Sequence, residues 1–506
     1  MALVGGANSM YIPDLPKSRG GRWRLRGLRF VHTHLHGEPL TQDDFLDLAF
    51  LRLDMIAAVR VDQNGGAGML EAAHILPADG SGEKSGWRVL PLMPCHTPEL
   101  DFLELTRSIE EELERTRSAI PADKEKDRAI LVSVATGDVE DARNSMAELV
   151  ELARSSGIAV ADVIIQRPRE INRKHLIGKG KLGEIVISAL QHGIDLLIFD
   201  QDLNPSQIRS ITDATELRVI DRTQLILAIF AQRAQSREGK IQVEMAQLKH
   251  LLPRLGMKDD ALSRLTGGIG ARGPGETKLE INRRRTKDRI SHLERELKTV
   301  RKNRAQRRAR RVRKEAPIIS IVGYTNAGKS SLMNTLTHSQ VFAGDQLFAT
   351  LDPTSRRLRF PRDFEVIITD TVGFIRDLPK DLLESFMATL EELYDADVLL
   401  HVVDVSNPAF EEQMAAVERI LAQLELTEKP TVLVFNKVDL ADPAYVREQV
   451  RRYGAVPISA LSASTLEPLI IALQDRVEAL MTEEFLHPPR QNEEMEEREK
   501  LEEESM

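Results

Sequence analysis

Cysteine, aromatic residues and long apolar runs are all scarce in this chain of 506 residues. A single cysteine, Cys95, excludes an internal disulfide framework and is typical of a reducing compartment. No apolar run reaches the roughly 18 residues of a membrane span, and the N-terminus lacks the basic and then apolar layout of a secretory signal. Hydrophobic residues still make up 42% of the chain, which is enough for several domain cores. We therefore expect a cytoplasmic, monomeric, multidomain protein without a membrane partner.

Basic residues are fewer than acidic ones, 69 against 78, which gives a formal net charge of −9. Yet the segment from Arg283 to Lys314 holds sixteen lysines and arginines and only three acidic residues. Such a basic stripe on an acidic protein indicates contact with a polyanion. The alternative is a solvated helix face, which normally mixes the two signs more evenly.

A glycine-rich loop follows the apolar run 318–322, where we expect a buried strand. It has the pattern G-x-x-x-x-G-K-S, in which backbone N–H groups surround the phosphates of a nucleoside triphosphate. We expect Lys329 to reach the β- and γ-phosphates and the Ser330 hydroxyl to bind Mg²⁺. The predicted phosphate-binding residues are Gly323, Tyr324, Thr325, Asn326, Ala327, Gly328, Lys329 and Ser330.

The base is predicted from an N-K-x-D pattern that follows the apolar run 431–435. The Asp439 carboxylate accepts hydrogen bonds and matches the N1–H and N2–H₂ donors of guanine, whereas adenine presents an acceptor at N1. We expect Asn436 to brace the loop, Lys437 to lie along the base and the Ala460 amide to donate to O6. GTP is therefore the predicted ligand, and its base-binding residues are Asn436, Lys437, Val438, Asp439, Ser459, Ala460 and Leu461.

Two further segments are predicted to sense the γ-phosphate. Asp370, after the expected strand 366–369, should hold Mg²⁺ through water, and the Gly373 amide should contact the γ-phosphate. Switch I should lie between residues 341 and 357, with Thr350 as the preferred Mg²⁺ ligand and Thr354 as the competing choice. The predicted catalytic residues are Lys329, Thr350 and Gly373, and the switch residues are Phe348, Ala349, Thr350, Leu351, Asp352, Asp370, Thr371, Val372 and Gly373.

Phe374 stands where many GTPases carry a glutamine that orients the attacking water. A phenylalanine side chain makes no hydrogen bond, so we expect slow intrinsic hydrolysis until a partner or an ion completes the site. The alternative is that Phe374 merely covers the site. Asn326 suggests one such ion, because similar GTPases with asparagine at this place use K⁺ near the phosphates.

Strand and helix patterns alternate through the middle of the chain, which predicts βαβ units with a mostly parallel sheet. The apolar residues Ile290, Leu293, Leu297 and Val300 repeat at 3-4-3 spacing and predict a helical seam that carries the basic stripe. We divide the chain into an N-terminal extension (1–125), an α/β domain (126–256), a glycine-rich loop with a basic helical hairpin (257–315), a nucleotide domain (316–481) and an acidic tail (482–506).

Several of these motifs resemble the HflX branch of translational GTPases. In the nucleotide domain they are 325–330, 348–352 and 370–374, and before it they are 177–181, 219–223, 230–234, 248–255 and 267–278. The resemblance covers roughly residues 126–481. It implies an α/β fold, in which a P-loop GTPase domain with helices on both faces of its sheet follows an α/β HflX N-terminal domain.

The same resemblance implies a function. Members of this family bind the large ribosomal subunit and split stalled or idle ribosomes, and the ribosome stimulates their GTP hydrolysis. The basic stripe would then meet rRNA phosphates, and binding should weaken with salt. A different hypothesis is an RNA-remodelling or ribosome-assembly factor that uses GTP as a binding switch and does not split ribosomes.

The N-terminal extension carries alternating histidines, His32 and His34, followed by Asp44. Alternate residues of a strand share a face, so the two histidines could bind zinc. This spacing resembles the metal site of JAB/MPN-type metallopeptidases, whose chemistry needs a glutamate before the histidines. No glutamate precedes Glu38 here. We therefore expect a degenerate or incomplete JAB/MPN-like domain with a structural role, and a bifunctional metallopeptidase–GTPase is the competing hypothesis.

Overall fold

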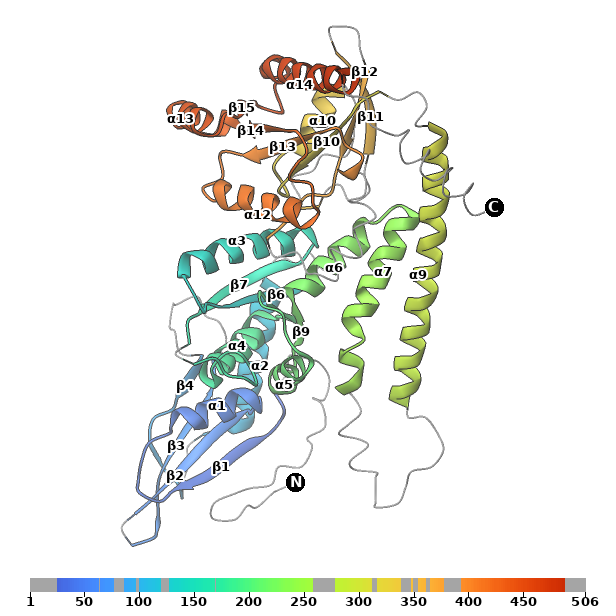
Figure 1. The fold of residues 1–506 in the computed structure, drawn as a ribbon. Coiled ribbons are helices and arrows are strands. Elements are labelled where there is room, and N and C mark those ends of the chain that lie inside the picture. The colour runs from blue at the N-terminus through green and yellow to red at the C-terminus, as the bar shows by residue number, and fades with distance from the viewer. Residues whose placement is uncertain are drawn as a thin grey trace. The chain divides into compact units, whose positions relative to one another are not determined.

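The computed structural model describes residues 25–62, 64–76, 86–96, 100–119, 127–168, 170–257, 278–311, 316–337, 347–348, 354–360, 365–376 and 393–486. The chain divides into two compact units, Met1–Leu225 and Ile226–Met506, each of which is described by itself (Figure 1). Among the described residues, no helix is both long and apolar enough to cross a membrane.

The first unit begins with a five-stranded sheet of order β1-β2-β3-β4, in which β5 also pairs with β3. Strand β1 is parallel to β2, and the other pairs are antiparallel. A capping box at Thr41 starts the first helix. The elements are β1 (Arg29–His34), α1 (Gln42–Phe50), β2 (Met55–Val61), β3 (Ala67–Ile75), β4 (Trp87–Val89), β5 (Met93–Pro94) and α2 (Phe102–Ala119).

A second sheet in the same unit has four strands, all parallel, in the order β7-β6-β8-β9. The predicted alternation of strand and helix is confirmed here, because a helix follows every strand along the chain. The elements are β6 (Arg128–Val134), α3 (Val139–Ser155), β7 (Ala159–Gln166), α4 (Lys179–His192), β8 (Leu196–Phe199), α5 (Pro205–Thr215), β9 (Arg218–Asp221) and α6 (Arg222–Arg233).

Helix α4 belongs to the cores of both sheets. Its residues Val186, Ile187 and Leu190 are buried against the first sheet with α1 and α2. Its residues Ile185 and Ala189 are buried against the second sheet. The division that we placed at residue 125 therefore separates two sheets of one compact unit.

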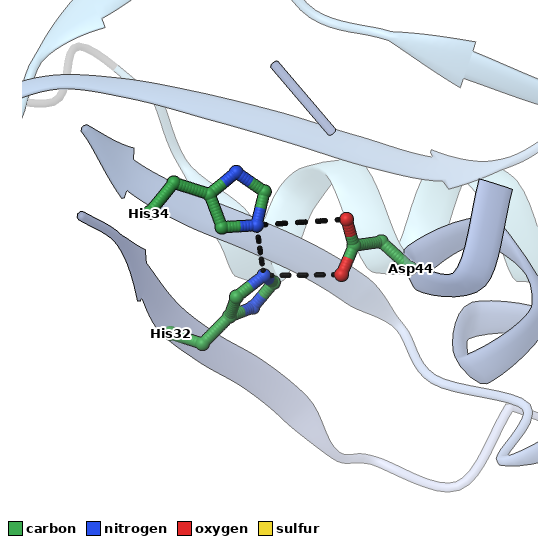
Figure 2. Close-up of side chains that lie close together, drawn as sticks. All are labelled: His32, His34 and Asp44. Atoms are coloured by element: carbon green, nitrogen blue, oxygen red, sulfur yellow. Dashed lines mark hydrogen bonds and ion pairs between the residues drawn. The ribbon is translucent and has the colours of Figure 1, made fainter. Parts of the chain in front are cut away.

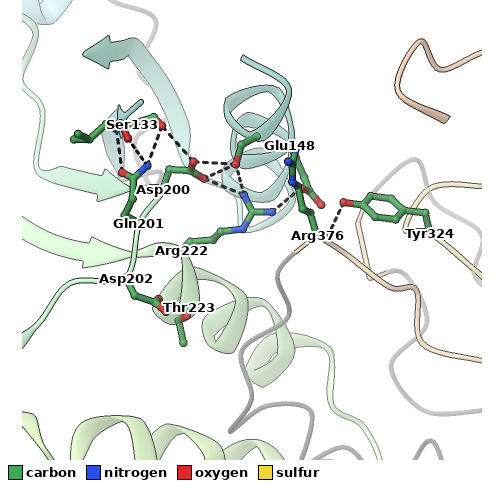
Figure 3. Close-up of polar contacts among 11 residues, drawn as sticks. Ser133, Glu148, Asp200, Gln201, Asp202, Arg222, Thr223, Tyr324 and Arg376 are labelled. Atoms are coloured by element: carbon green, nitrogen blue, oxygen red, sulfur yellow. Dashed lines mark hydrogen bonds and ion pairs between the residues drawn. The ribbon is translucent and has the colours of Figure 1, made fainter. Parts of the chain in front are cut away.

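A buried ionic network fixes the start of α6 within the first unit (Figure 3). The Arg222 guanidinium donates to Asp200 Oδ1 at 3.0 Å and to Glu148 Oε2 at 2.5 Å. The next residue, Thr223, donates through its hydroxyl to Asp202 Oδ1 at 2.6 Å. A buried charge is tolerated only when it is paired in this way. The structure therefore explains why the segment 219–223 contains these polar residues.

The second unit contains a pair of long helices, α7 (Arg237–Leu251) and α9 (Lys278–Arg311), and the short helix η1 (Arg254–Met257) between them in sequence. The two long helices run side by side (Figure 1). The predicted seam exists, since Ile290, Leu293 and Leu297 of α9 are buried against Ile241 and Met245 of α7. The hairpin that we confined to residues 257–315 is therefore made, among the described residues, with a helix that precedes that range.

The nucleotide domain is built on a six-stranded sheet of order β11-β12-β10-β13-β14-β15, in which only the β11–β12 pair is antiparallel. One face carries α10 and α14, and the other carries α12 and α13, as the two apolar clusters show. The strands are β10 (Ile318–Gly323), β11 (Thr354–Arg359), β12 (Glu365–Asp370), β13 (Val398–Asp404), β14 (Thr431–Asn436) and β15 (Val456–Pro457). The helices are α10 (Lys329–Thr337), α12 (Phe410–Gln423), η3 (Val438–Leu440), α13 (Pro443–Tyr453), η4 (Ala463–Thr465) and α14 (Glu467–Leu486).

This sheet confirms the predicted doubly covered α/β fold. Helix α14 continues to Leu486, five residues beyond the end that we expected for the domain. The predicted acidic tail from residue 487 onward lies outside the described residues.

Candidate functional site

The phosphate-binding loop joins the buried strand β10 to the start of α10. Two glycines are required for its shape: a Cβ at Gly323 would lie 2.2 Å from the Val402 carbonyl oxygen, and one at Gly328 would lie 2.2 Å from Asn436 Nδ2. Gly328 has a φ of +91°, a conformation that side chains rarely adopt. The loop is thus formed by close backbone approaches, as a phosphate-binding site needs.

Lys329 is buried in the first turn of α10 and points back into the loop. Its Nζ donates to the Tyr324 carbonyl oxygen at 2.7 Å. Burial lowers the pKa of Lys329 to about 8, and the nearby Asp370 carboxylate opposes that shift only in part. The protein therefore balances the positive charge of Lys329 only in part. The negative charge of a nucleotide's phosphates would balance the rest.

The residues predicted to hold Mg²⁺ lie together where they are described. The Ser330 hydroxyl donates to Asp370 Oδ2 at 2.7 Å, at the end of strand β12. A hydroxyl and a carboxylate oxygen are the hard ligands that Mg²⁺ prefers, so this donor set fits the ion. The favoured switch threonine, Thr350, lies outside the described residues. The competing Thr354 is the first residue of β11 and pairs in register with Asp370.

The segment after Asp370 is tied to strand β10 and lies against Lys329 of the phosphate-binding loop. The Thr371 hydroxyl donates to the Ile321 carbonyl oxygen at 2.6 Å. A Cβ at Gly373 would lie 2.8 Å from Lys329 Nζ, so only glycine fits beside the lysine. Its neighbour Val372 is buried. This closeness suits an amide that senses the γ-phosphate.

Phe374 is held in place by its backbone. Its N–H donates to the Gly323 carbonyl oxygen at 3.1 Å, and its own carbonyl oxygen accepts from the Thr325 N–H at 2.7 Å. The side chain is only 2% exposed. The ring therefore serves packing and has no polar atom with which to orient a water molecule. Nearby, the Arg376 N–H donates to the Tyr324 hydroxyl at 2.6 Å (Figure 3).

Of the predicted switch I residues, Phe348 lies within the described part of the chain, and Ala349, Thr350, Leu351 and Asp352 lie outside it. Phe348 is buried and has a positive φ of 56°. Its ring meets Phe230 of α6 edge to face, with the centroids 4.5 Å apart. An aromatic pair of this kind stabilises the contact by about 1 kcal/mol beyond its burial.

The base-binding loops are joined by Asn436. Its Nδ2 donates to the Ala327 carbonyl oxygen at 2.7 Å, and its Oδ1 accepts from the Ala460 N–H at 2.8 Å. This residue braces the phosphate-binding loop against the loop after β15, as its position in the motif suggested. The Ala460 N–H that we expected to donate to O6 has a protein partner in this structure, so its contact with a base stays a prediction.

The remaining base-site residues surround that brace. Lys437 adopts a left-handed φ of 63°, and its Nζ lies 2.7 Å from Asp404 Oδ2 of β13. Asp439 is exposed in the middle of η3, where a base can reach its carboxylate. Val438 is half-buried, Ser459 is buried, and Leu461 is 84% exposed.

His401 is a site neighbour that the sequence did not indicate. It lies in the middle of β13 and is buried, and its pKa is lowered to about 4 by burial and by the charge of Lys329. A histidine inside an apolar strand run resembles any core residue, so only the pairing of His401 with Val322 of β10 reveals that it lies within reach of the lysine charge. It is a neutral imidazole at physiological pH.

Comparison with known proteins covers most of this architecture. Residues 143–231 match the family model of the N-terminal region of GTP-binding GTPases, and 233–311 match that of their middle region. Residues 318–437 match a family model described as a 50S ribosome-binding GTPase. A solved GTP-binding protein from Sulfolobus solfataricus in complex with GDP aligns with a TM-score of 0.39 and 26% identity, over 70% of this chain and 99% of that one.

Curated relatives named GTPase HflX are similar over a long stretch of the chain. The protein of Caldanaerobacter subterraneus subsp. tengcongensis is 48% identical over 319 residues, which are 63% of this chain and 74% of that one. The Escherichia coli protein is 41% identical over 368 residues, 72% of this chain and 86% of that one. The chain therefore belongs to the HflX family of GTPases, which bind guanine nucleotides and hydrolyse GTP.

Proposed function

We propose that this GTPase binds the large (50S) ribosomal subunit and its rRNA. In this proposal it uses GTP binding and hydrolysis to split stalled or idle ribosomes, or to aid ribosome recycling or biogenesis. The observation that carries the proposal is helix α9, which holds most of the basic stripe in a single helix of 34 residues. At 1.5 Å per residue it extends about 50 Å, long enough to follow several phosphates of an RNA.

The exposed side of α9 carries an excess of positive charge. Two of its acidic residues pair with α7, Glu296 with Arg237 and Glu294 with Lys249 at 3.5 Å, and its basic Arg289 pairs with Glu244 of α7 at 2.7 Å. By contrast, Arg283 and Arg285 are exposed. Asp288 is exposed among them, so the described residues of this side carry both signs with a basic excess. Such an excess attracts a polyanion.

Phe374 supports the view that the nucleotide site lacks a group for orienting the attacking water, which a partner must supply. Its buried ring replaces the glutamine that would orient water, so intrinsic hydrolysis should be slow. A ribosome that supplies or orders the missing group would make hydrolysis conditional on docking. The hydrolysis rate should therefore rise when large subunits are added.

Two ions belong to the same proposal. Mg²⁺ would be held by Ser330 and, through water, by Asp370, with Thr350 from switch I, and it would shield the β- and γ-phosphate charges. K⁺ near Asn326 would add positive charge at the phosphates. Asn326 adopts a φ of 61°, which places it at a sharp turn of the loop. Hydrolysis in K⁺ should exceed hydrolysis in Na⁺ if this site is used, and equal rates would exclude it.

Sedimentation of purified ribosomes tests the proposal directly. The full chain should co-sediment with large subunits when GTP or a non-hydrolysable analogue is present, and intact ribosomes should separate into subunits. Ribosomes that stay joined with both nucleotides would exclude splitting. Large subunits that fail to retain the protein would exclude the ribosome as partner.

Charge reversal tests the role of α9 separately. The variant Arg283→Glu/Arg285→Glu should bind large subunits more weakly, and its binding should depend less on salt, by about one unit of log–log slope for each lost phosphate contact. Arg447→Glu/Arg451→Glu is a matched control, since both of these arginines are exposed on helix α13. Equal loss in the two variants would show that net charge alone matters.

The second candidate function is an RNA-remodelling or assembly factor that uses GTP as a switch. The same basic helix favours it, because an rRNA segment needs no intact ribosome to bind there. Nucleotide-dependent binding to large subunits without separation of joined ribosomes is the outcome that selects this alternative.

A further inference from the structure

A cluster of three side chains lies in the N-terminal extension, outside the residues that the family models match. His32 and His34 are alternate residues of β1, so both project from the face that α1 covers. Asp44 extends towards them from the first turn of α1 (Figure 2). No element of the nucleotide site contributes to this cluster.

The three side chains meet through atoms that carry lone pairs. The two histidine Nε2 atoms lie 2.9 Å apart. Asp44 Oδ1 lies 3.1 Å from His32 Nε2, and Asp44 Oδ2 lies 3.6 Å from His34 Nε2. Since the Glu38 carbonyl oxygen lies 2.9 Å from His34 Nδ1, that nitrogen carries the proton of a neutral ring. His34 Nε2 then has only a lone pair to present.

The three side chains have too few hydrogen-bond donors for the acceptors that meet there. The carboxylate of Asp44 is an acceptor only, and neutral His34 is an acceptor at Nε2. A single proton on His32 Nε2 would have to serve both of them. A divalent cation satisfies all three atoms at once. The alternative is a protonated imidazolium, which would hold the same contacts without an ion.

The spacing and the supports also suit a metal ion. Two ligands about 2.1 Å from a tetrahedral zinc ion lie about 3.4 Å apart, and the observed separations run from 2.9 to 3.6 Å. The Glu38 carbonyl orients His34, as a protein acceptor orients most histidine ligands. Asp44 Oδ2 is held by the backbone N–H of Thr41 at 2.6 Å and by its hydroxyl at 2.7 Å.

We propose that His32, His34 and Asp44 form a zinc site, with a water molecule as the fourth ligand. Two imidazoles favour zinc over Mg²⁺ or Ca²⁺, which prefer oxygen ligands. The three side chains are 20%, 10% and 13% exposed, so an ion and a water molecule can reach them from solvent. The site is independent of the nucleotide and of the ribosome.

Zinc titration of the full chain tests this site. Chelator-treated protein is loaded with GDP and Mg²⁺ to occupy the nucleotide site, and zinc binding is followed by calorimetry and by elemental analysis. We expect one tightly held zinc ion per chain. His32→Ala and His34→Ala should each weaken its binding by at least about tenfold. His36→Ala, an exposed histidine two residues farther along, is the matched control and should bind as the parent protein does.

Two further measurements separate loss of metal from loss of fold. Cobalt in place of zinc should give the strong visible absorption of a four-coordinate site in the parent protein and in His36→Ala only. Asp44→Asn keeps an acceptor for the Thr41 N–H, so its thermal unfolding without zinc should match the parent protein. With zinc, the parent protein should unfold at a higher temperature, and Asp44→Asn should not.

The proposal is overturned if the parent protein binds zinc no more tightly than the His32→Ala/His34→Ala double variant. It is also overturned if His36→Ala loses zinc to the same degree. A pH-dependent gain in stability at low pH that zinc does not alter would assign the contacts to a protonated histidine instead.

Discussion

The nucleotide site and the His32–His34–Asp44 cluster are two ligand sites built in opposite ways. In the nucleotide site most of the cradle is backbone, and the buried Lys329 carries its charge. In the cluster every candidate ligand is a side chain, and a strand and a helix must meet before any site exists. A backbone cradle demands glycines at fixed positions and so leaves a readable pattern. A side-chain cluster leaves only residue types, which many sequences share.

Adding a single methyl group to a glycine should therefore greatly weaken nucleotide binding at the nucleotide site. Gly328→Ala would place a Cβ 2.2 Å from Asn436 Nδ2, at a φ of +91°. The strain and the lost hydrogen bond together cost about 4 kcal/mol, so GTP affinity should fall by about a thousandfold. Gly180→Ala is the control, because a Cβ there meets nothing within 4 Å. Calorimetric affinities within tenfold of each other would refute the backbone-built description.

The base is expected to be bound by a side chain, because Asp439 should determine the preference for guanine. Asp439→Asn removes two charge-assisted hydrogen bonds to guanine and should lower GTP affinity by about a hundredfold. It should also raise the affinity for xanthosine triphosphate, whose ring offers an acceptor to the new amide. Asp442→Asn is a close control, since asparagine caps α13 as well as aspartate does. Competition binding measures both, and an unchanged base preference in Asp439→Asn would mean that the base lies elsewhere.

The burial of Lys329 makes the first site sensitive to pH. Its pKa is lowered to about 8 in the free protein, whereas bound phosphates favour the charged form and raise it. Above this pKa, binding must take up a proton, so GTP affinity should fall by about fivefold between pH 8 and pH 9. Calorimetry in two buffers of different ionisation enthalpy would detect the proton. Binding without proton uptake at pH 9 would contradict the burial of a neutral lysine.

Among these substitutions, the smallest effect on ligand binding should come from removing the Thr41 side chain, which holds Asp44 in the cluster. Thr41→Ala removes the hydroxyl that holds Asp44 Oδ2, and it removes the N-cap of α1. We expect a loss of about 1 kcal/mol in the free energy of unfolding and a loss of about tenfold in zinc affinity. Ser236→Ala removes the N-cap of α7, away from the cluster, and should leave zinc binding unchanged. Denaturant unfolding and zinc titration of both variants make this comparison.

The sequence predicted the candidate nucleotide site because the motifs of that site lie at the ends of strands. Asn436 was expected to brace a loop, and it links Ala327 to Ala460 as that role requires. What sequence reasoning missed depends on contacts between distant segments. His401 lies within reach of the charge of Lys329 only because β13 lies beside β10. The Ala460 N–H has a protein partner that no spacing could indicate.

The same limit applies to the extension and to the basic hairpin. His32 and His34 share a strand face by the alternation of any strand, but the approach of Asp44 depends on how α1 packs. The seam on α9 could be read from its 3-4-3 spacing. Its partner α7 could not, because apolar spacing shows that a helix has a neighbour and does not identify it.

Helix α4 packs into both cores of the first unit. The N-terminal extension and the α/β domain should therefore fold together. Deleting residues 1–125 would leave Val186, Ile187 and Leu190 uncovered in water, at about 1.5–3 kcal/mol for each side chain. Such a truncated protein should aggregate, and its loss of activity would be mistaken for a catalytic role of the extension. The two sheets should also melt in one transition, so a destabilising change in either one lowers the stability of both.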